Sequence, residues 1–158
     1  MSDAKTHIVL PVVSGDLPSS YAGDISADEA WRTLAGNPQA VLVDVRTQPE
    51  WNFVGIPDLS PLGRDPVLVE WQTYPAMTVN RDFVKDVTSS LGAIGRDTPI
   101  LLLCRSGARS RAAAIALSAA GFTHSYNVAG GFEGDLNEAR QRGTANGWKA
   151  SGLPWRQS

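Results

Sequence analysis

The chain contains a single cysteine, Cys104, and its neighbours are those expected around a reactive thiol. Apolar residues at 99–103 lead into it, and the polar, basic segment "RSGARS" follows at 105–110. The apolar stretch predicts a buried strand over 99–104, and the alanine-rich stretch predicts a helix over 109–121. Cys104 is therefore expected where a strand gives way to a helix, the edge at which open parallel sheets bind their ligands.

The segment after Cys104 can form a cradle around the sulfur. Backbone N–H groups at a helix start carry partial positive charge and favour a thiolate over a thiol. Gly107 permits a positive φ in such a turn, and Arg105 and Arg109 add cationic donors for an incoming anion. Serine hydroxyls in the same loop supply further donors. The residues expected to bind the substrate are Arg105, Ser106, Gly107, Ala108, Arg109 and Ser110.

A simpler interpretation is that Cys104 is a small buried hydrophobe, as many lone cysteines are. A core cysteine usually has apolar neighbours on both sides, whereas here only the preceding side is apolar. The basic, glycine-containing loop at a strand-to-helix junction favours a nucleophile.

Strand and helix patterns alternate along the chain. Ser26 and Glu29 form a capping box at the start of one helix, and Gly92 and Gly121 follow the ends of two others. The alternation predicts an α/β domain with a mainly parallel sheet flanked by helices. The expected strands are 40–45, 66–74, 99–104 and 123–128, and the expected helices are 26–36, 80–92 and 109–121, with at least a helical turn in 131–143 and an irregular tail over 147–155.

Length and composition exclude several classes of function. The 158 residues are enough for one domain with its own core. A formal net charge of −2 gives no nucleic-acid footprint. The lone cysteine excludes an internal disulfide framework, and no Asp, Glu or His grouping resembles a metal site, so we expect neither a metal nor a cofactor. The sequence pattern indicates neither a signal peptide nor a membrane span, so we expect the protein to be cytoplasmic.

The length of the cysteine loop indicates its chemistry. Cysteine phosphatases have five residues between the cysteine and an arginine, whereas here Arg109 comes one position earlier. This shorter loop, "CRSGAR", resembles the active-site loop of the rhodanese superfamily. The segments "VLVDVRTQPEW" (41–51), "YNVAGGFEGD" (126–135) and "GWKASGLPW" (147–155) also resemble motifs of that family, in the same order.

The resemblance implies a rhodanese-like three-layer domain over residues 24–158, preceded by an N-terminal extension, 1–23. It also implies sulfur transfer, in which Cys104 takes a sulfane sulfur from a small anionic donor such as thiosulfate. The resulting persulfide passes it to cyanide or a thiol, with a protein thiol as a possible acceptor. No His partner is needed, since His7 and His124 are isolated in the sequence.

The chain departs from the family in the segment after its first motif. A long loop, 55–80, begins "GIPDLSPLG" where a His-Ile-Pro-Gly turn is usual, and it carries Trp71 and Tyr74. Because this segment can border the catalytic mouth, the resemblance does not define the acceptor.

Alternatives remain open at three points. A small cysteine phosphatase or arsenate reductase-like enzyme would use the same thiol, and a regulatory module would use none. Asp44 and Arg46 could shape the active-site floor, although an ion pair that ties a loop to the sheet is favoured. Gly130 and Gly131 are expected to form a tight turn, and a role near the sulfur is the alternative.

Overall fold

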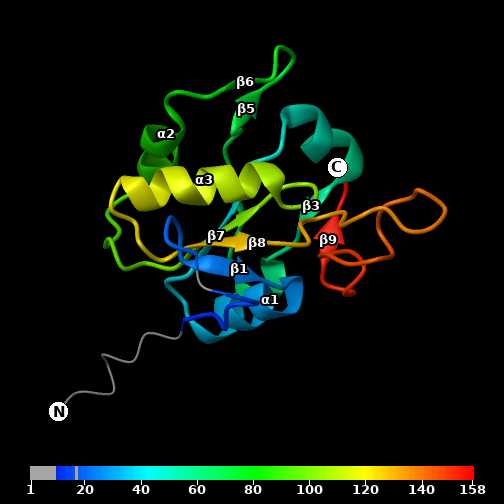
Figure 1. Cartoon of the computed structure of the whole chain (residues 1–158), viewed down its shortest axis with the longest axis horizontal. Coiled ribbons are helices and arrows are strands. Elements are labelled where there is room, and N and C mark those ends of the chain that lie inside the picture. Colours follow the sequence, from blue (N-terminus) through cyan, green and yellow to red (C-terminus); the bar gives the residue numbers. More distant parts are fainter. Residues whose placement is uncertain (1–9, 17) are drawn as a thin grey trace.

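A computed structural model describes residues 10–16 and 18–158 (Figure 1). Its core is a five-stranded sheet with the order β1-β8-β7-β2-β4, in which every neighbouring pair is parallel. The strands are β1 Gly23–Ile25, β2 Val41–Asp44, β4 Val67–Leu68, β7 Ile100–Leu103 and β8 Ser125–Val128. The expectation of a mainly parallel sheet is confirmed.

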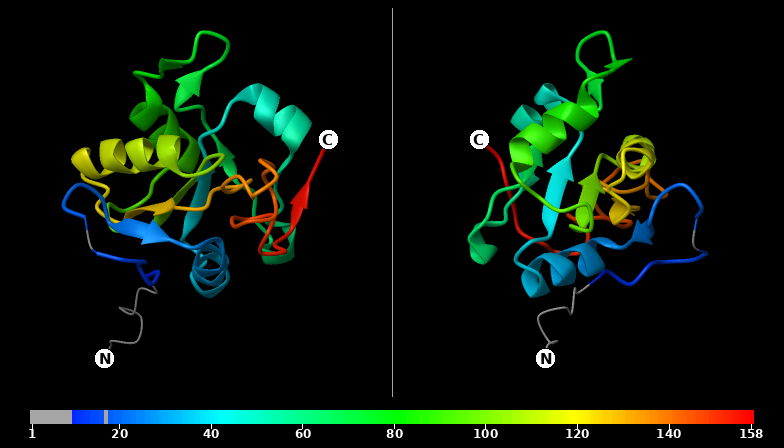
Figure 2. Two further views of the ribbon diagram at one scale, coloured as in Figure 1. Left: turned by 45° about the vertical axis from the view of Figure 1, so that its right-hand side comes forward. Right: turned by 90° about the vertical axis from the view of Figure 1, so that its left-hand side faces the viewer.

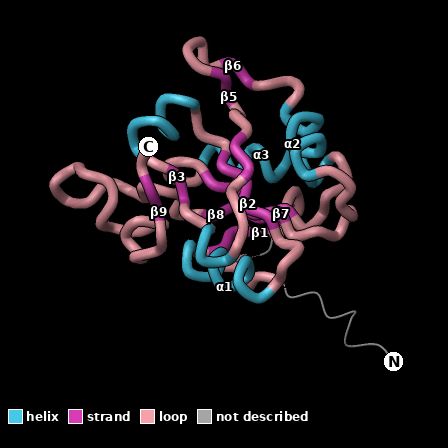
Figure 3. The backbone as a smooth tube through the Cα atoms, turned by 180° about the vertical axis from the view of Figure 1, so that it is seen from behind, coloured by secondary structure: helices cyan, strands magenta, loops and turns pink. Residues whose placement is uncertain are grey.

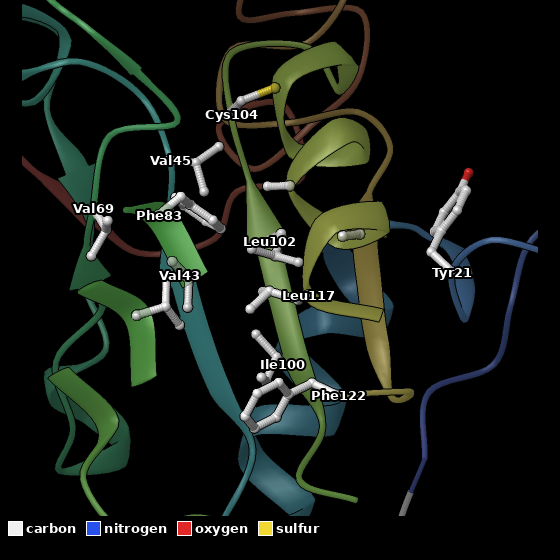
Figure 4. Packing of buried hydrophobic residues seen from close by; sticks show 13 residues of the cluster. Tyr21, Val43, Val45, Val69, Phe83, Ile100, Leu102, Cys104, Leu117 and Phe122 are labelled. Carbon is white, nitrogen blue, oxygen red and sulfur yellow. The ribbon is translucent and has the colours of Figure 1, made fainter. Parts of the chain in front are cut away.

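Helices cover both faces of this sheet, so the domain has three layers (Figure 2). The helices are α1 Ala27–Gly36, α2 Phe83–Leu91 and α3 Ala108–Ala119. Successive side chains of a strand point to opposite faces. In β7, Ile100 and Leu102 accordingly pack with residues of α2 and α3, as Figure 4 shows, while Leu101 and Leu103 pack with residues of α1. Burial on both faces explains why β7 is a continuous apolar segment.

The ends of the helices follow from local hydrogen bonding. The Ser26 hydroxyl accepts the backbone N–H of Glu29 at 3.1 Å and so caps α1, as expected. Gly92, with φ 71°, ends α2. The start of α2 differs from the expected 80–92, because Asn80 Oδ1 accepts the N–H of Asp82 in a turn that precedes the helix.

The expected strand over 66–74 is wrong in its extent. Only β4 belongs to the central sheet, although Val69 and Trp71 still donate backbone hydrogen bonds to the end of β2. The chain then leaves the sheet, since β2 itself ends there. It forms an antiparallel hairpin of β5 Gln72–Thr73 and β6 Thr78–Val79, which projects from the domain (Figure 3).

The other short elements lie around the long loop. A π-helix covers Glu50–Val54, and a 3-10 helix covers Ser60–Leu62. Strand β3 Ile56–Pro57 pairs antiparallel with β9 Trp155–Arg156, which brings the C-terminal tail beside the start of the loop (Figure 1).

The expected helical turn in 131–143 is also wrong, since this segment consists of turns and bends. Gly131, Gly134 and Gly143 all have positive φ, which is incompatible with a helix. The turns pack on the cysteine loop, where the N–H of Phe132 donates to Cys104 O at 2.7 Å and the N–H of Gly134 donates to Arg105 O at 3.1 Å.

The N-terminal extension is only partly described, and His7 lies outside the described residues. In the described part, Ser14 N donates to Asp24 O at 2.7 Å, which joins the extension to β1. The boundary at residue 23 stays a prediction. Among the described residues, no helix is long and apolar enough to cross a membrane.

Candidate active site

Cys104 lies directly after β7, at the carboxyl edge of the sheet, and only 1% of it is exposed. In Figure 4 its sulfur points from the end of β7 toward the first turn of α3. The predicted strand-to-helix junction is therefore present, and it places the thiol in a buried, largely enclosed position.

Two donors of the loop reach the sulfur. The backbone N–H of Gly107 lies 3.1 Å from Cys104 Sγ, and the Ser110 hydroxyl lies 3.2 Å from it. Gly107 has φ 118°, and a Cβ there would lie 2.4 Å from the carbonyl oxygen of Ala129. Only glycine can therefore hold this N–H in place.

The glycine pair after β8 supports the loop from behind. Gly131 has φ 67°, and an added Cβ would meet Arg105 O at 2.5 Å and Cys104 O at 2.7 Å. Its own N–H donates to Val128 O at 2.9 Å, as a tight turn requires. The expected turn at Gly130 and Gly131 is therefore present, and it contacts the backbone of the cysteine loop directly.

Arg109 is held by an acidic residue that the sequence analysis did not assign to it. Its guanidinium makes a bidentate ion pair with Glu50, at 2.7 and 3.0 Å. Thr47 donates to the same carboxylate through its N–H at 3.1 Å and its hydroxyl at 2.9 Å. Burial raises the pKa of Glu50, but the hydrogen bonds and charge of Arg109 outweigh it and bring that pKa down to about 2. Hydrogen bonding to Glu50 raises the pKa of Arg109.

Asp44 and Arg46 form a buried ion pair at the end of β2. Both side chains are fully buried, with Arg46 Nη2 2.6 Å from Asp44 Oδ2 and Arg46 Nε 2.9 Å from Asp44 Oδ1. Arg46 also donates to Gly55 O at 2.7 Å and lies over the Phe132 ring at 4.2 Å. The pair thus ties the start of the long loop to the end of β2.

The remaining predicted residues differ in their exposure to solvent. Arg105 is exposed, Ser106 is half-buried, and Ala108 is the exposed first residue of α3. His124 precedes β8 and so lies at the opposite edge of the sheet from Cys104. Among the described residues, no cluster of three or more His, Cys, Asp and Glu could hold a metal ion.

Behind Ser110 lies a buried polar chain that the sequence analysis missed. The Ser110 hydroxyl lies 2.6 Å from Asn127 Oδ1, and Asn127 Nδ2 donates to Asp24 Oδ1 at 3.0 Å. The Tyr21 hydroxyl donates to the same Asp24 oxygen at 2.8 Å. The sequence carried no clear signal for it, because the predicted strand 123–128 reads THSYNV and is polar at several positions.

A parallel sheet covered by helices on both faces, with a cysteine loop around the sulfur at a helix start, is the arrangement that the resemblance to the rhodanese superfamily implies. The family described as STR4 middle domain matches residues 22–158. The chain belongs to this family.

Three known proteins are similar to this chain over most of its length. Protein RP600 of Rickettsia prowazekii (strain Madrid E) is 36% identical over 132 residues, covering 84% of this chain and 95% of its own. The crystal structure of Rv0390 from M. tuberculosis shares 52% identity and a TM-score of 0.79, covering 88% of this chain and 100% of that one. The polysulfide-sulfur transferase homodimer of Wolinella succinogenes shares the fold, at 22% identity and a TM-score of 0.55, over 85% of this chain and 78% of its own.

Proposed function

We propose that this protein is a sulfurtransferase that moves a sulfane sulfur through a persulfide on Cys104. The observation that carries the proposal is the convergence of the Gly107 N–H and the Ser110 hydroxyl on Cys104 Sγ. Two donors directed at one buried sulfur stabilise negative charge there, as a nucleophile and leaving group requires.

The reaction has two steps. The Cys104 thiolate attacks the outer sulfur of a donor such as thiosulfate, whose S–S bond breaks to release sulfite, and Cys104 becomes a persulfide. Cyanide or a thiolate then attacks the outer persulfide sulfur, leaving as thiocyanate or a new persulfide and returning the Cys104 thiolate. This is covalent catalysis with ping-pong kinetics, and it needs no redox partner.

The loop residues have different roles in this scheme. Arg105, exposed at the mouth, attracts and binds the anionic donor. Arg109 is already paired with Glu50, so we assign it the holding of the loop in addition to its charge at the site. The half-buried Ser106 is a further candidate donor to the substrate. A small protein or low-molecular-weight thiol in the cytoplasm is the acceptor class that fits a lone, buried thiol.

The rival assignments make different use of the same loop. A phosphatase or arsenate reductase-like enzyme requires a cradle wide enough for an oxyanion, and this loop is one residue shorter. A non-catalytic module has no use for a cysteine held by two donors.

One experiment separates the three. Thiosulfate is added to the protein, the intact mass is recorded, and thiocyanate formation with cyanide is measured beside p-nitrophenyl phosphate hydrolysis. We expect a gain of one sulfur atom that a reducing thiol reverses, thiocyanate as product, and no phosphate release. Uptake of sulfur by Cys104→Ser as in the wild type would overturn the proposal.

A further inference from the structure

We infer that Asn127 is a positioning residue for the thiol, because it determines whether the Ser110 hydroxyl proton is given to Cys104 Sγ. This inference deepens the proposed function and rests on it, since it concerns how reactive the sulfur-carrying group is. Asn127 is only 3% exposed and does not touch the sulfur, so it acts through Ser110 alone.

The orientation of the Asn127 amide is determined by its neighbours. Its NH2 group donates to Asp24 Oδ1 at 3.0 Å, and Asp24 is held in turn by the Tyr21 hydroxyl at 2.8 Å. The amide oxygen therefore faces Ser110, 2.6 Å from its hydroxyl oxygen. Because β8 lies between β1 and β7, both the amide and its anchor are part of the sheet.

The Ser110 hydroxyl has one proton and two acceptors. This proton can be donated to Asn127 Oδ1, 2.6 Å from the hydroxyl oxygen, or to Cys104 Sγ, 3.2 Å from it, but not to both at once. A neutral thiol is compatible with the first arrangement, because the S–H can donate to the Ser110 oxygen. A thiolate, in contrast, needs the hydroxyl proton for itself.

Turning the hydroxyl toward the thiolate has a cost at Asn127. The two oxygens would then face each other at 2.6 Å with no proton between them, and a buried acceptor would lose its partner. Asn127 therefore competes with a thiolate for the Ser110 hydroxyl proton and weakens, without abolishing, the hydrogen bond that Ser110 gives to sulfur. The same competition applies in the second step of the reaction, when Sγ becomes the leaving group and again gains negative charge.

The charged groups around the sulfur take no part in this competition for the Ser110 proton. Arg109 interacts electrostatically with both Cys104 and Asp44, Glu50 pairs with Arg109, and Arg105 lies at the mouth. None of these groups is changed in the variants below; Asp24→Ala removes a different carboxylate, which reaches the sulfur only through Asn127 and Ser110.

The test is the rate at which iodoacetamide alkylates Cys104, measured across the pH range in which a thiol titrates. In Asn127→Leu the hydroxyl is free to donate to sulfur, and we expect alkylation at neutral pH to be about three- to ten-fold faster, the range of one hydrogen bond. Ser110→Ala should be slower than wild type. In the double variant the Leu substitution should have no effect, because no hydroxyl remains to be redirected.

Two further variants keep the test decisive. Asp24→Ala frees the Asn127 amide and should also accelerate alkylation. The share of this acceleration that comes from the Ser110 hydroxyl should be absent when Ser110→Ala is added. This variant replaces Asn127→Leu in the test if Asn127→Leu does not fold. Ser125→Ala is the matched control, since it removes a buried hydroxyl of the same strand that donates to Phe122 O. Alkylation rates unchanged in the Asn127 and Asp24 variants, or equal acceleration with and without Ser110, would overturn the inference. Because alkylation requires no sulfur donor, these outcomes are distinct from a failure of the proposed sulfur transfer.

Discussion

Arg109 in the first turn of α3 and Glu50 in the π-helix, 59 positions apart in the chain, form a bidentate ion pair beside the cysteine loop. Their side chains are 18% and 20% exposed, so solvent weakens the pair only in part. Glu50 also accepts the backbone N–H of Thr47. The ion pair therefore connects the motif at 41–51 with the cysteine loop. The conformation of the loop thus depends on a residue far from it in sequence.

The low pKa of Glu50 predicts a specific loss of stability in acid. Its folded-state pKa of about 2 lies below the ordinary value of 4.5, so the unfolded chain takes up the proton first as the pH falls. The stabilisation is therefore complete above about pH 4.5 and is lost on the way to about pH 2. Allowing for partial exposure, we expect about 1–2 kcal/mol of unfolding free energy to depend on it.

Glu50→Gln should lack this component. Urea unfolding at several pH values between neutral and acid conditions measures it, and Glu70→Gln provides a control that changes a carboxylate away from Arg109. Equal slopes of stability against pH in wild type and Glu50→Gln would contradict the prediction.

Replacing the thiol should abolish function without unfolding the protein. Cys104 lies at a strand end where Ala would remove only one atom from the packing, and Ser110 keeps Asn127 as a partner. We expect Cys104→Ala to lose sulfur transfer and to keep its stability within about 1–2 kcal/mol of wild type. Thermal unfolding followed by circular dichroism checks this. A variant that cannot fold would favour the interpretation of Cys104 as a buried hydrophobe.

The parts of the fold with a local cause were predictable from sequence. Ser26 caps its helix through a contact three residues away, and β7 is apolar because both of its faces are covered. The placement of Cys104 followed from these elements, since strand and helix are adjacent in the chain.

The incorrect predictions share a different cause. The segment 66–74 has strand composition throughout, but β2 ends after Asp44, and residues 72–73 pair with β6 in a hairpin and not with the central sheet. The segment 131–143 has helix formers, but Gly131, Gly134 and Gly143 have positive φ, and the resulting turns pack on Cys104 O and Arg105 O. Both depend on contacts with distant segments, as do the Glu50–Arg109 pair and the role of Asn127, and periodicity in one sequence carries no record of such contacts.

Breaking the buried ion pair should be strongly destabilising. In Arg46→Leu the Asp44 carboxylate would stay buried without its bidentate partner, and Gly55 O would lose a donor. We expect a loss of about 3–5 kcal/mol in the free energy of unfolding. The exposed ion pair of Arg32 and Glu29 provides the control, since Arg32→Leu should cost less than about 1 kcal/mol. Similar losses in the two variants would contradict the prediction.

The close approach of Gly131 to the cysteine loop predicts that a single methyl group impairs activity. Gly131→Ala places Cβ 2.5 Å from Arg105 O, so the loop backbone must shift. Gly152→Ala is the matched control, because its φ of 74° carries similar backbone strain but nothing lies within 4 Å of the added carbon. We expect the strained φ to destabilise both variants modestly, with a further loss of stability from the backbone contact and at least about ten-fold loss of sulfur transfer only in Gly131→Ala. Thiocyanate formation and urea unfolding of both variants measure this, and equal activity losses would show that the contact is unimportant.

The last prediction concerns the length of the loop, which distinguishes sulfur from phosphorus chemistry here. Adding one glycine between Arg105 and Ser106 gives the phosphatase spacing, while α3 still begins at Ala108 and Arg109 can keep Glu50. The ring of backbone amides should widen, so that Gly107 N–H no longer lies 3.1 Å from the sulfur and an oxyanion can enter. Each charge-assisted hydrogen bond lost contributes roughly 1.5–3 kcal/mol, so transfer should slow ten-fold or more.

The measurements are the rate of thiocyanate formation and the affinity for arsenate, made after circular dichroism shows that the loop variant is folded. A variant with a glycine added after Gly152 is the control. Undiminished sulfur transfer in the loop variant would show that the size of the cradle does not select the substrate, and the main argument against phosphatase chemistry would fail.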